Sequence, residues 1–364
     1  MDAAGEFDPW IELDLAALAS NVAQVRKRVG RRPIMAVVKC NAYGHGDVEI
    51  ASALQKRSDI RHFMVVQVRE AVRLRQHALE GMILNAGPFS TSQIPLLLEH
   101  GISQAVYTDA VLQLSEAART RGVTAKVHIY VDTGMGRVGV PHHVAADYIA
   151  RVAALPAIEI EGTFTDMTED DDFNPVQIKR FEAVCAEVQR RGIATGIRHA
   201  ASSAEVDRYP DAWLDMVRPG SCLVGLEPSK QKNLDIRCVM TFKARVAYVK
   251  SLQPGDSISY HRAYKIERPT RIATLACGYS DGYPPVVSGR SEVLIGGRRH
   301  PVVAPITANH IMVDVTSAPD VQIGDEVVLW GRQGAASVSM SELEALAPKA
   351  TNAYRPVLDR KSVV

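Results

Sequence analysis

The sequence predicts an α/β protein with two parts, an N-terminal (β/α)8 barrel of the TIM type and a C-terminal domain that is mostly β. Short apolar runs alternate with amphipathic segments up to about residue 235, which is typical of strands alternating with helices in a parallel sheet. Beyond that point short β-rich runs are separated by turn residues. The 364 residues are enough to bury more than one core. We therefore expect a barrel over residues 12–235 and a β-rich domain over residues 236–364, which residues 1–11 join.

The predicted barrel strands are eight apolar runs: Ile34–Val38, Phe63–Val68, Met82–Leu84, Ala105–Tyr107, Val127–Val131, Ile158–Ile160, Gly196–His199 and Met216–Leu223. The helices expected around them are Asp14–Val29, Val48–Lys56, Ser92–His100, Thr108–Arg119, His142–Leu155 and Gln177–Arg191. Strand–helix units of this number in about 220 residues favour a closed barrel. A doubly wound sheet is the alternative, although no GxGxxG sequence follows a strand and opens a helix.

The C-terminal part contains six predicted strands and one short helix. The strands are Val246–Leu252, Arg271–Cys277, Glu292–Ile295, His300–Ala304, Ile311–Val315 and Glu326–Trp330, and the helix is Ser341–Leu346. Turn signals such as Pro254-Gly255 and Gly296-Gly297 separate the strands. The run Trp10–Leu13 is a further candidate strand of this domain.

Composition excludes several classes of function. The formal net charge is +1, so broad electrostatic binding to nucleic acid or to an anionic membrane is not expected. No apolar run approaches the roughly 20 residues of a membrane span, and Met1–Trp10 lacks the apolar segment of a secretory signal. The five cysteines are scattered without a CxxC spacing, which predicts no disulfide framework, no zinc site and a reducing, cytoplasmic environment. We read the acidic run at 169–172 as a solvated loop and expect no metal.

The first candidate for chemistry is Lys39, which ends the apolar run Ile34–Val38. In a barrel the carboxyl ends of the strands carry the active site. Partial desolvation there lowers the pKa of a lysine, which suits covalent bonding to a carbonyl group. A single lysine at the end of a strand has a simpler interpretation, in which its amine reaches solvent. The surrounding string VVKCNAYGHG, residues 37–46, changes that balance.

Six motifs in order resemble the alanine racemases, the barrel-type family of pyridoxal-phosphate (PLP) enzymes. They are VVKCNAYGHG (37–46), VDTGMGRVG (131–139), RHAASSA (198–204), DMVRPG (215–220), RPTR with GYSDGYP (268–271 and 278–284) and MVDVT (312–316). Taken singly, most have a plain structural reading as turn glycines, surface arginines or half-buried tyrosines. Together they make chance agreement negligible.

The resemblance implies how PLP would be held. Lys39 would carry PLP covalently and exchange protons at the substrate Cα. Tyr43 and Tyr354 would hydrogen-bond the phosphate, with Ser203 and with backbone N–H groups near Gly220 and Ser221. A phosphate site in the loops after strands 7 and 8 is common in such barrels.

The resemblance also implies the residues around the PLP ring and the substrate. Arg218, supported by His199, would face the pyridine nitrogen and keep it unprotonated, which favours racemisation over transamination. Arg137 would meet the PLP 3-oxygen or the substrate carboxylate. Tyr279 would be the second base, supplied by the second domain of a partner subunit. The implied assembly is a head-to-tail homodimer with shared active sites.

Four departures from the family pattern fall on the implied active site. Tyr130 stands where the family has a lysine, commonly carbamylated, that holds the arginine, so Arg137 needs another anchor. Asp166 replaces a histidine near the ring, and its charge would oppose proton removal from the catalytic tyrosine. It is also a candidate proton carrier, so we count Asp166 among the candidate catalytic residues. Ala308 and Asn309 replace Met and Asp and enlarge the pocket and make it less acidic.

The sequence therefore predicts a PLP-dependent amino-acid racemase that uses Lys39 and Tyr279 as two bases on a small amino acid. The alternative is a diverged PLP enzyme of the same fold that works on one face of Cα, by decarboxylation, retro-aldol cleavage or a biosynthetic reaction, on a larger amino acid. A third reading, a PLP carrier without activity, fits less well, because such relatives are usually the barrel alone.

Overall fold

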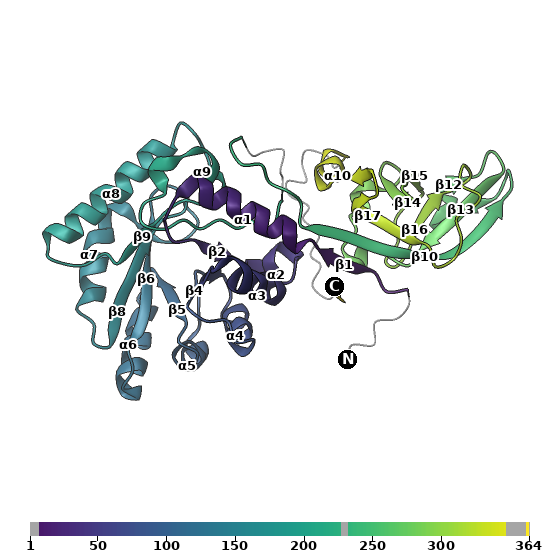
Figure 1. Ribbon diagram of the computed structural model, residues 1–364. Coiled ribbons are helices and arrows are strands. Elements are labelled where there is room, and N and C mark those ends of the chain that lie inside the picture. The colour runs from purple at the N-terminus through teal and green to yellow at the C-terminus, as the bar shows by residue number, and fades with distance from the viewer. Residues whose placement is uncertain (1–6, 227–231, 347–361, 364) are drawn as a thin grey trace. The chain divides into compact units, whose positions relative to one another are not determined.

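The computed structural model describes residues 7–226, 232–346 and 362–363 (Figure 1). The chain divides into two compact units. One runs from Ala16 to Arg237, and the other combines the residues up to Leu15 with those from Cys238 onward.

The first unit is a barrel of parallel strands, and the predicted fold class is confirmed. Its strands pair in chain order: β2 (Met35–Val37), β3 (His62–Val65), β4 (Met82–Asn85), β5 (Ser103–Val106), β6 (Ala125–Asp132), β8 (Ile158–Phe164) and β9 (Ile197–His199). Met216 and Val217 close the ring, because Met216 bridges to His199 and Val217 bridges to Ile34, both in parallel. The short strand β7 (Val140–Pro141) pairs with β6 at the edge.

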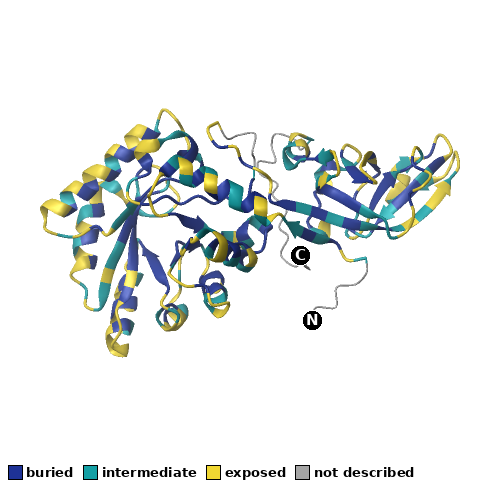
Figure 2. Ribbon diagram, viewed as in Figure 1, coloured by how far each residue is buried: buried dark blue, intermediate teal, exposed yellow. Residues whose placement is uncertain are grey.

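Helices surround the barrel strands (Figure 1). They are α1 (Leu15–Val29), α3 (Asp47–Ser58), α4 (Val68–Gln76), α5 (Ile94–Glu99), α6 (Ala110–Arg121), α7 (His142–Ala153), α8 (Asn174–Arg190) and α9 (Ser203–Arg208). Figure 2 shows most residues of β2 to β6 buried, β8 buried only towards its end, and the outer helix faces exposed. In α8, Ile178, Phe181 and Val184 are buried on one face, as their spacing predicts. Strand β6 is buried continuously from Val127 to Val131, because both faces of a barrel strand are covered.

One predicted strand is wrong in its second half. The run Met216–Leu223 forms bridges at Met216 and Val217, its hydrogen bonding to β2 ends at the Pro219 carbonyl, which accepts the Val37 N–H at 2.9 Å, and a turn follows at 221–225. Pro219 cannot donate a ladder hydrogen bond, and the backbone from Gly220 on turns towards Ser203 instead. The sequence reading also missed α4 and α9.

The second unit contains a closed antiparallel barrel. The pairings run β17–β14–β15–β16–β13–β10 and return from β10 to β17. These strands are β10 (Met240–Leu252), β13 (Thr270–Leu275), β14 (Glu292–Ile295), β15 (Arg298–Val303), β16 (Ile311–Asp314) and β17 (Glu326–Gln333). Alternate residues of β10, such as Phe242, Ala244 and Val246, point into its core.

Shorter elements complete this unit. They are β1 (Trp10–Leu13), β11 (Ser257–Ile258), β12 (Tyr264–Lys265), β18 (Ala336–Val338), α10 (Met340–Leu346) and β19 (Ser362–Val363). Strand β1 pairs antiparallel with β10, as the candidate strand at Trp10–Leu13 predicts. Among helices of the described residues, none combines the length and the apolar character that a bilayer crossing requires.

Candidate active site

Lys39 follows β2 and opens a turn of unusual hand. The segment α2 (Lys39–Gly44) is left-handed, since Cys40, Asn41, Ala42 and Tyr43 all have φ between 49° and 57°. This conformation costs about 1–2 kcal/mol for each residue with a side chain. Strain of this kind persists only where the surroundings impose it, and it clusters at functional sites.

The side chains of Glu70, Asn41 and His45 hold the left-handed turn. Glu70 Oε1 accepts the N–H of Cys40 at 2.7 Å, and its Oε2 accepts the N–H groups of Val66 and Gln67, just before α4, at 3.1 Å each. Asn41 Oδ1 accepts the N–H of Asp47 at 3.1 Å. The His45 ring lies 3.0 Å from the Ala42 carbonyl through Nδ1. The strand-end lysine is therefore fixed by contacts that the sequence reading did not anticipate, Glu70 above all.

The amine of Lys39 has a perturbed environment. Burial lowers its pKa, and the guanidinium groups of Arg137 and Arg218 lower it further. The Asp166 carboxylate opposes this effect and raises the pKa. A lysine shifted in this direction has a larger neutral, nucleophilic fraction near neutral pH.

Ser203 and Gly220 form a close junction beside Tyr43. Ser203 Oγ accepts the backbone N–H of Gly220 at 3.0 Å and that of Cys222 at 3.2 Å. A Cβ at Gly220 would lie 2.4 Å from the Tyr43 hydroxyl, so only glycine fits there. Ser221 begins the turn that follows and accepts the N–H of Leu226 through its carbonyl at 2.9 Å. Four of the five residues predicted to form a phosphate site, all except Tyr354, therefore lie together.

Arg218 is buried, with 4% of its surface exposed. Its guanidinium donates to the carbonyls of Thr165 at 2.6 Å and Ala200 at 2.8 Å, and to Asp166 Oδ1 at 2.8 Å. It also lies over the Phe164 ring, 5.1 Å from the centroid. Its Nε is buried without a hydrogen-bond partner among the described residues. The Nε–H donor of Arg218 therefore has no acceptor among the described residues, although the rest of its guanidinium is held by three oxygens.

His199 belongs to a buried network behind Phe164. Its ring stacks on Phe164 at 4.9 Å, and its Nε2 lies 2.9 Å from His128 Nδ1. Burial lowers the pKa of His199 well below its usual value, and Arg218 contributes to the same shift, so the ring is neutral. His199 and Arg218 thus pack against the same aromatic ring.

Asp166 joins the two arginines. Its Oδ2 accepts a hydrogen bond from the Tyr130 hydroxyl at 2.6 Å and one from Arg137 at 2.5 Å, while its Oδ1 accepts from Arg218. Burial alone would raise the pKa of Asp166, but Arg218, Tyr130 and Arg137 together hold it below its usual value. The positions that depart from the family pattern in this unit are therefore in direct contact.

Tyr279 lies in the other unit, at the start of the short turn η5 (Tyr279–Asp281). Its side chain is 51% exposed, and its N–H donates to the Thr307 carbonyl at 3.0 Å. A Cβ at Gly278 would lie 2.2 Å from that same carbonyl oxygen, so glycine is required for the approach. Ala308 and Asn309 line an open pocket of about 620 Å3 with Tyr279. Tyr354, the other predicted tyrosine, is outside the described residues.

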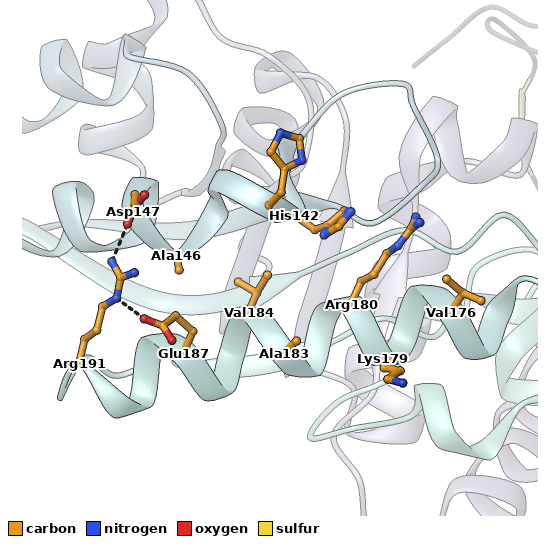
Figure 3. Close-up of a pocket in the computed structure, with 11 residues that line it drawn as sticks. His142, Ala146, Asp147, Val176, Lys179, Arg180, Ala183, Val184, Glu187 and Arg191 are labelled. Carbon is orange, nitrogen blue, oxygen red and sulfur yellow. Dashed lines mark hydrogen bonds and ion pairs between the residues drawn. The ribbon is translucent and has the colours of Figure 1, made fainter.

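Another pocket, of about 470 Å3, lies between α7 and α8 (Figure 3). Arg191 bridges its one end through Asp147 and Glu187, each at 2.7 Å. The site residues predicted from sequence do not line it. The described ranges also bring no three His, Cys, Asp or Glu side chains into an arrangement that could hold a metal ion.

Comparison with known proteins agrees with the motif pattern. The family model described as "Alanine racemase, N-terminal domain" matches residues 13–228, and the one described as "Alanine racemase, C-terminal domain" matches residues 239–355. The chain belongs to the alanine racemase family. This confirms the resemblance inferred from the six motifs, and it makes the chain an isomerase of the racemase class.

Individual members of the alanine racemase family align along almost the whole chain. The alanine racemase of Symbiobacterium thermophilum is 41% identical, covering 95% of this chain and 94% of its own. That of Halothermothrix orenii is 38% identical over 92% and 90%. Among solved structures, the alanine racemase from D-cycloserine-producing Streptomyces lavendulae has a TM-score of 0.90 at 29% identity, covering 98% of this chain and 97% of its own.

Proposed function

We propose that this protein is a PLP-dependent alanine racemase, in which Lys39 carries the cofactor and exchanges a proton on one face of the substrate Cα. The observation that carries the proposal is the meeting of Lys39, Arg137 and Arg218 around one carboxylate, at the ends of parallel barrel strands. The family membership supports alanine as the substrate, because the curated relatives are named alanine racemases.

The residues present fit PLP. The buried Nε of Arg218, which has no partner among the described residues, can donate to an uncharged pyridine nitrogen. The Ser203 hydroxyl accepts two backbone N–H groups and keeps its own proton to donate to a phosphate oxygen. Tyr43, Gly220 and Ser221 border the same junction and would complete the phosphate site, with Tyr354 as a further donor.

Each remaining side chain has a defined task in this proposal. The chemistry that bound PLP would supply is to make the Cα proton of the substrate acidic. The Arg218 guanidinium, held by Asp166 and two backbone carbonyls, would donate to the ring nitrogen and limit electron withdrawal by the ring, which favours simple proton exchange. Arg137 orients the substrate carboxylate or the PLP 3-oxygen. His199 stays neutral and supports Phe164, on which Arg218 packs.

The second proton site is assigned to Tyr279 of a partner subunit, in a head-to-tail homodimer with shared active sites. The exposure of Tyr279 supports this assignment, as does that of Tyr260, which is 78% exposed and lines the same open pocket. Large exposed aromatic side chains around a pocket are typical of a surface that a partner covers. The scattered cysteines support a cytoplasmic location.

The test is chiral chromatography of alanine incubated with the purified protein and PLP. The proposal expects L- and D-alanine to interconvert, and it expects both Lys39→Ala and Tyr279→Phe to abolish interconversion. If Tyr279→Phe retained turnover of an amino acid to another product while Lys39→Ala lost it, the alternative of one-faced Cα chemistry would be correct. Absence of any turnover in the PLP-loaded protein would favour a cofactor carrier.

A further inference from the structure

We propose that Asp166, together with Tyr130, is a built-in anchor that fixes Arg137 relative to Arg218, so that Asp166 acts by positioning and not by carrying a proton. The inference rests on the proposed function, because it assigns the orientation of the substrate to Arg137. It gives a role to two of the four positions that depart from the family pattern.

Both oxygens of the Asp166 carboxylate are occupied. Oδ1 faces Arg218 at 2.8 Å, and Oδ2 receives Arg137 at 2.5 Å and the Tyr130 hydroxyl at 2.6 Å. Arg137 also approaches the Tyr130 hydroxyl at 3.3 Å. A hydroxyl and two guanidinium groups thus converge on one carboxylate and use three of its roughly four acceptor positions, so Asp166 is poorly suited to receive a proton from substrate.

Tyr130 and Arg218 are held in buried positions, whereas Arg137 follows a loop. Tyr130 lies within β6, is 2% exposed and stacks on Phe164 at 4.4 Å. Arg218 is buried and donates to two barrel carbonyls besides Asp166. Arg137 follows the glycine-containing loop at 134–136, and its side chain is 57% exposed. Without Asp166 and Tyr130 the loop alone would have to orient this guanidinium.

The charges around Asp166 also favour a positioning role over proton transfer. The arginines keep Asp166 ionised, while burial and the neighbouring carboxylate raise the pKa of Tyr130, so the phenol stays protonated and donates. A carboxylate stabilised by two permanent cations is a weak base and exchanges protons poorly near neutral pH. The four charged or titratable groups that act on Lys39 are Asp166, Cys40, Arg137 and Arg218. Removal of the Asp166 charge would therefore lower the pKa of Lys39 further.

The test compares Asp166→Asn, which keeps the shape and removes the charge, with Tyr130→Phe, which keeps the ring and removes the hydroxyl. Asp166→Asn is expected to raise KM for alanine roughly ten- to a hundredfold with a smaller fall in kcat, since a charge-assisted contact is lost. Tyr130→Phe is expected to raise KM by roughly three- to tenfold, since one neutral donor is lost. Asp147→Asn, which breaks a surface ion pair with Arg191, is the matched control and should change none of these values.

A second readout needs neither PLP nor turnover. Competitive acetylation of the cofactor-free protein across a pH series, followed by peptide mass spectrometry, measures the pKa of Lys39. The anchor predicts a lower pKa in Asp166→Asn than in the unchanged protein, with circular dichroism showing that the variant is folded. If Asp166→Asn does not fold, Tyr130→Phe still tests the anchor through KM.

Different results would refute the Asp166–Tyr130 anchor and the proposed racemase function. A large loss of kcat in Asp166→Asn with KM unchanged would mean that Asp166 carries a proton, and the anchor would be wrong. An unchanged Lys39 pKa together with unchanged KM in both variants would also refute it. If the unchanged protein failed to racemise alanine but the Lys39 pKa moved as expected, the proposed function would fail while the anchor remained.

Discussion

Ser203 shows how one hydroxyl can organise a phosphate site. Its oxygen accepts two buried N–H groups, from Gly220 and Cys222, and its hydroxyl retains one proton that it can donate to a ligand. We predict that Ser203→Ala raises the dissociation constant of PLP by roughly tenfold or more, because a donor to phosphate is lost and two buried N–H groups lose their acceptor. Titration of the cofactor-free protein, followed by absorbance, measures this change.

The control for Ser203→Ala is another buried serine. Ser115, on α6, donates to the Pro156 carbonyl at 2.6 Å. Ser115→Ala should lower the thermal midpoint and leave PLP affinity unchanged. Equal PLP affinity in Ser203→Ala and in the unchanged protein would contradict the proposed phosphate site.

The residues of the candidate site could be named from the sequence, but the contacts between them could not be predicted. Tyr130 and Asp166 stand out from the family pattern as separate departures, 36 residues apart. Their contact depends on β6 and β8 being neighbours in a register that places Tyr130 opposite Phe164, two residues before Asp166. Glu70 left only a weak signal, a QxxE capping box at the start of α4, because its partner Cys40 is brought close by the barrel.

At the scale of elements, Glu161 ties three neighbouring strands together. From β8 it accepts Ser103 of β5 at 2.5 Å and Lys126 of β6 at 2.9 Å, and it lies 3.3 Å from His128 of β6. Burial alone would raise the pKa of Glu161, but these three partners lower it to about 2. The folded-state pKa is thus below the usual 4.5, so this group adds stability above pH 4.5 and loses it as pH falls towards 2.

We predict that Glu161→Gln lowers the free energy of unfolding at pH 7 by roughly 3–4 kcal/mol, because the pKa falls from 4.5 to about 2 on folding and each pKa unit is worth about 1.4 kcal/mol. The deficit relative to the unchanged protein should shrink between pH 4.5 and pH 2. Urea unfolding at a series of pH values measures it. Glu159→Gln, an exposed position on the same strand, is the control, and a deficit that stays constant with pH would show that Glu161 does not titrate as described.

Helices and strands were predicted correctly where the apolar spacing determines them. Prediction failed where proline and backbone hydrogen bonds determine the conformation. The helix face of α8 and the buried run of β6 follow directly from their apolar spacing. The run Met216–Leu223 begins and ends with apolar residues, but it leaves the sheet after Pro219, where the N–H groups of Gly220 and Cys222 turn to the Ser203 hydroxyl. The left-handed turn at 40–43 leaves no composition signal, since only one of its residues, Asn41, is a common left-handed type.

At the scale of the whole molecule, the class of both units was predictable because each repeats one pattern many times. The association of two subunits, in contrast, leaves no such repeated pattern in the sequence of one chain. The proposed sites need Lys39 from one protomer and Tyr279 from its partner, so each subunit alone would be incomplete.

Subunit complementation tests this assembly. Lys39→Ala and Tyr279→Phe should each be inactive as homodimers. Refolded or exchanged together, they should recover about a quarter of the unchanged activity, because half of randomly formed dimers are mixed and each mixed dimer holds one intact site. Racemase assays of the mixture measure the recovery. No recovery, with mixed dimers demonstrated by differentially tagged subunits, would show that the two residues act within one chain.

The central claim is that protons are exchanged on both faces of the alanine Cα. The most direct measurement is the reaction of L-alanine in deuterium oxide, followed at early times by proton NMR and chiral chromatography. We predict that deuterium enters the D-alanine formed, and that the reaction started from D-alanine places it in L-alanine. Deuterium that enters L-alanine with retained configuration, without D-alanine, would show exchange on one face only and would contradict the assignment of Tyr279 as the second base.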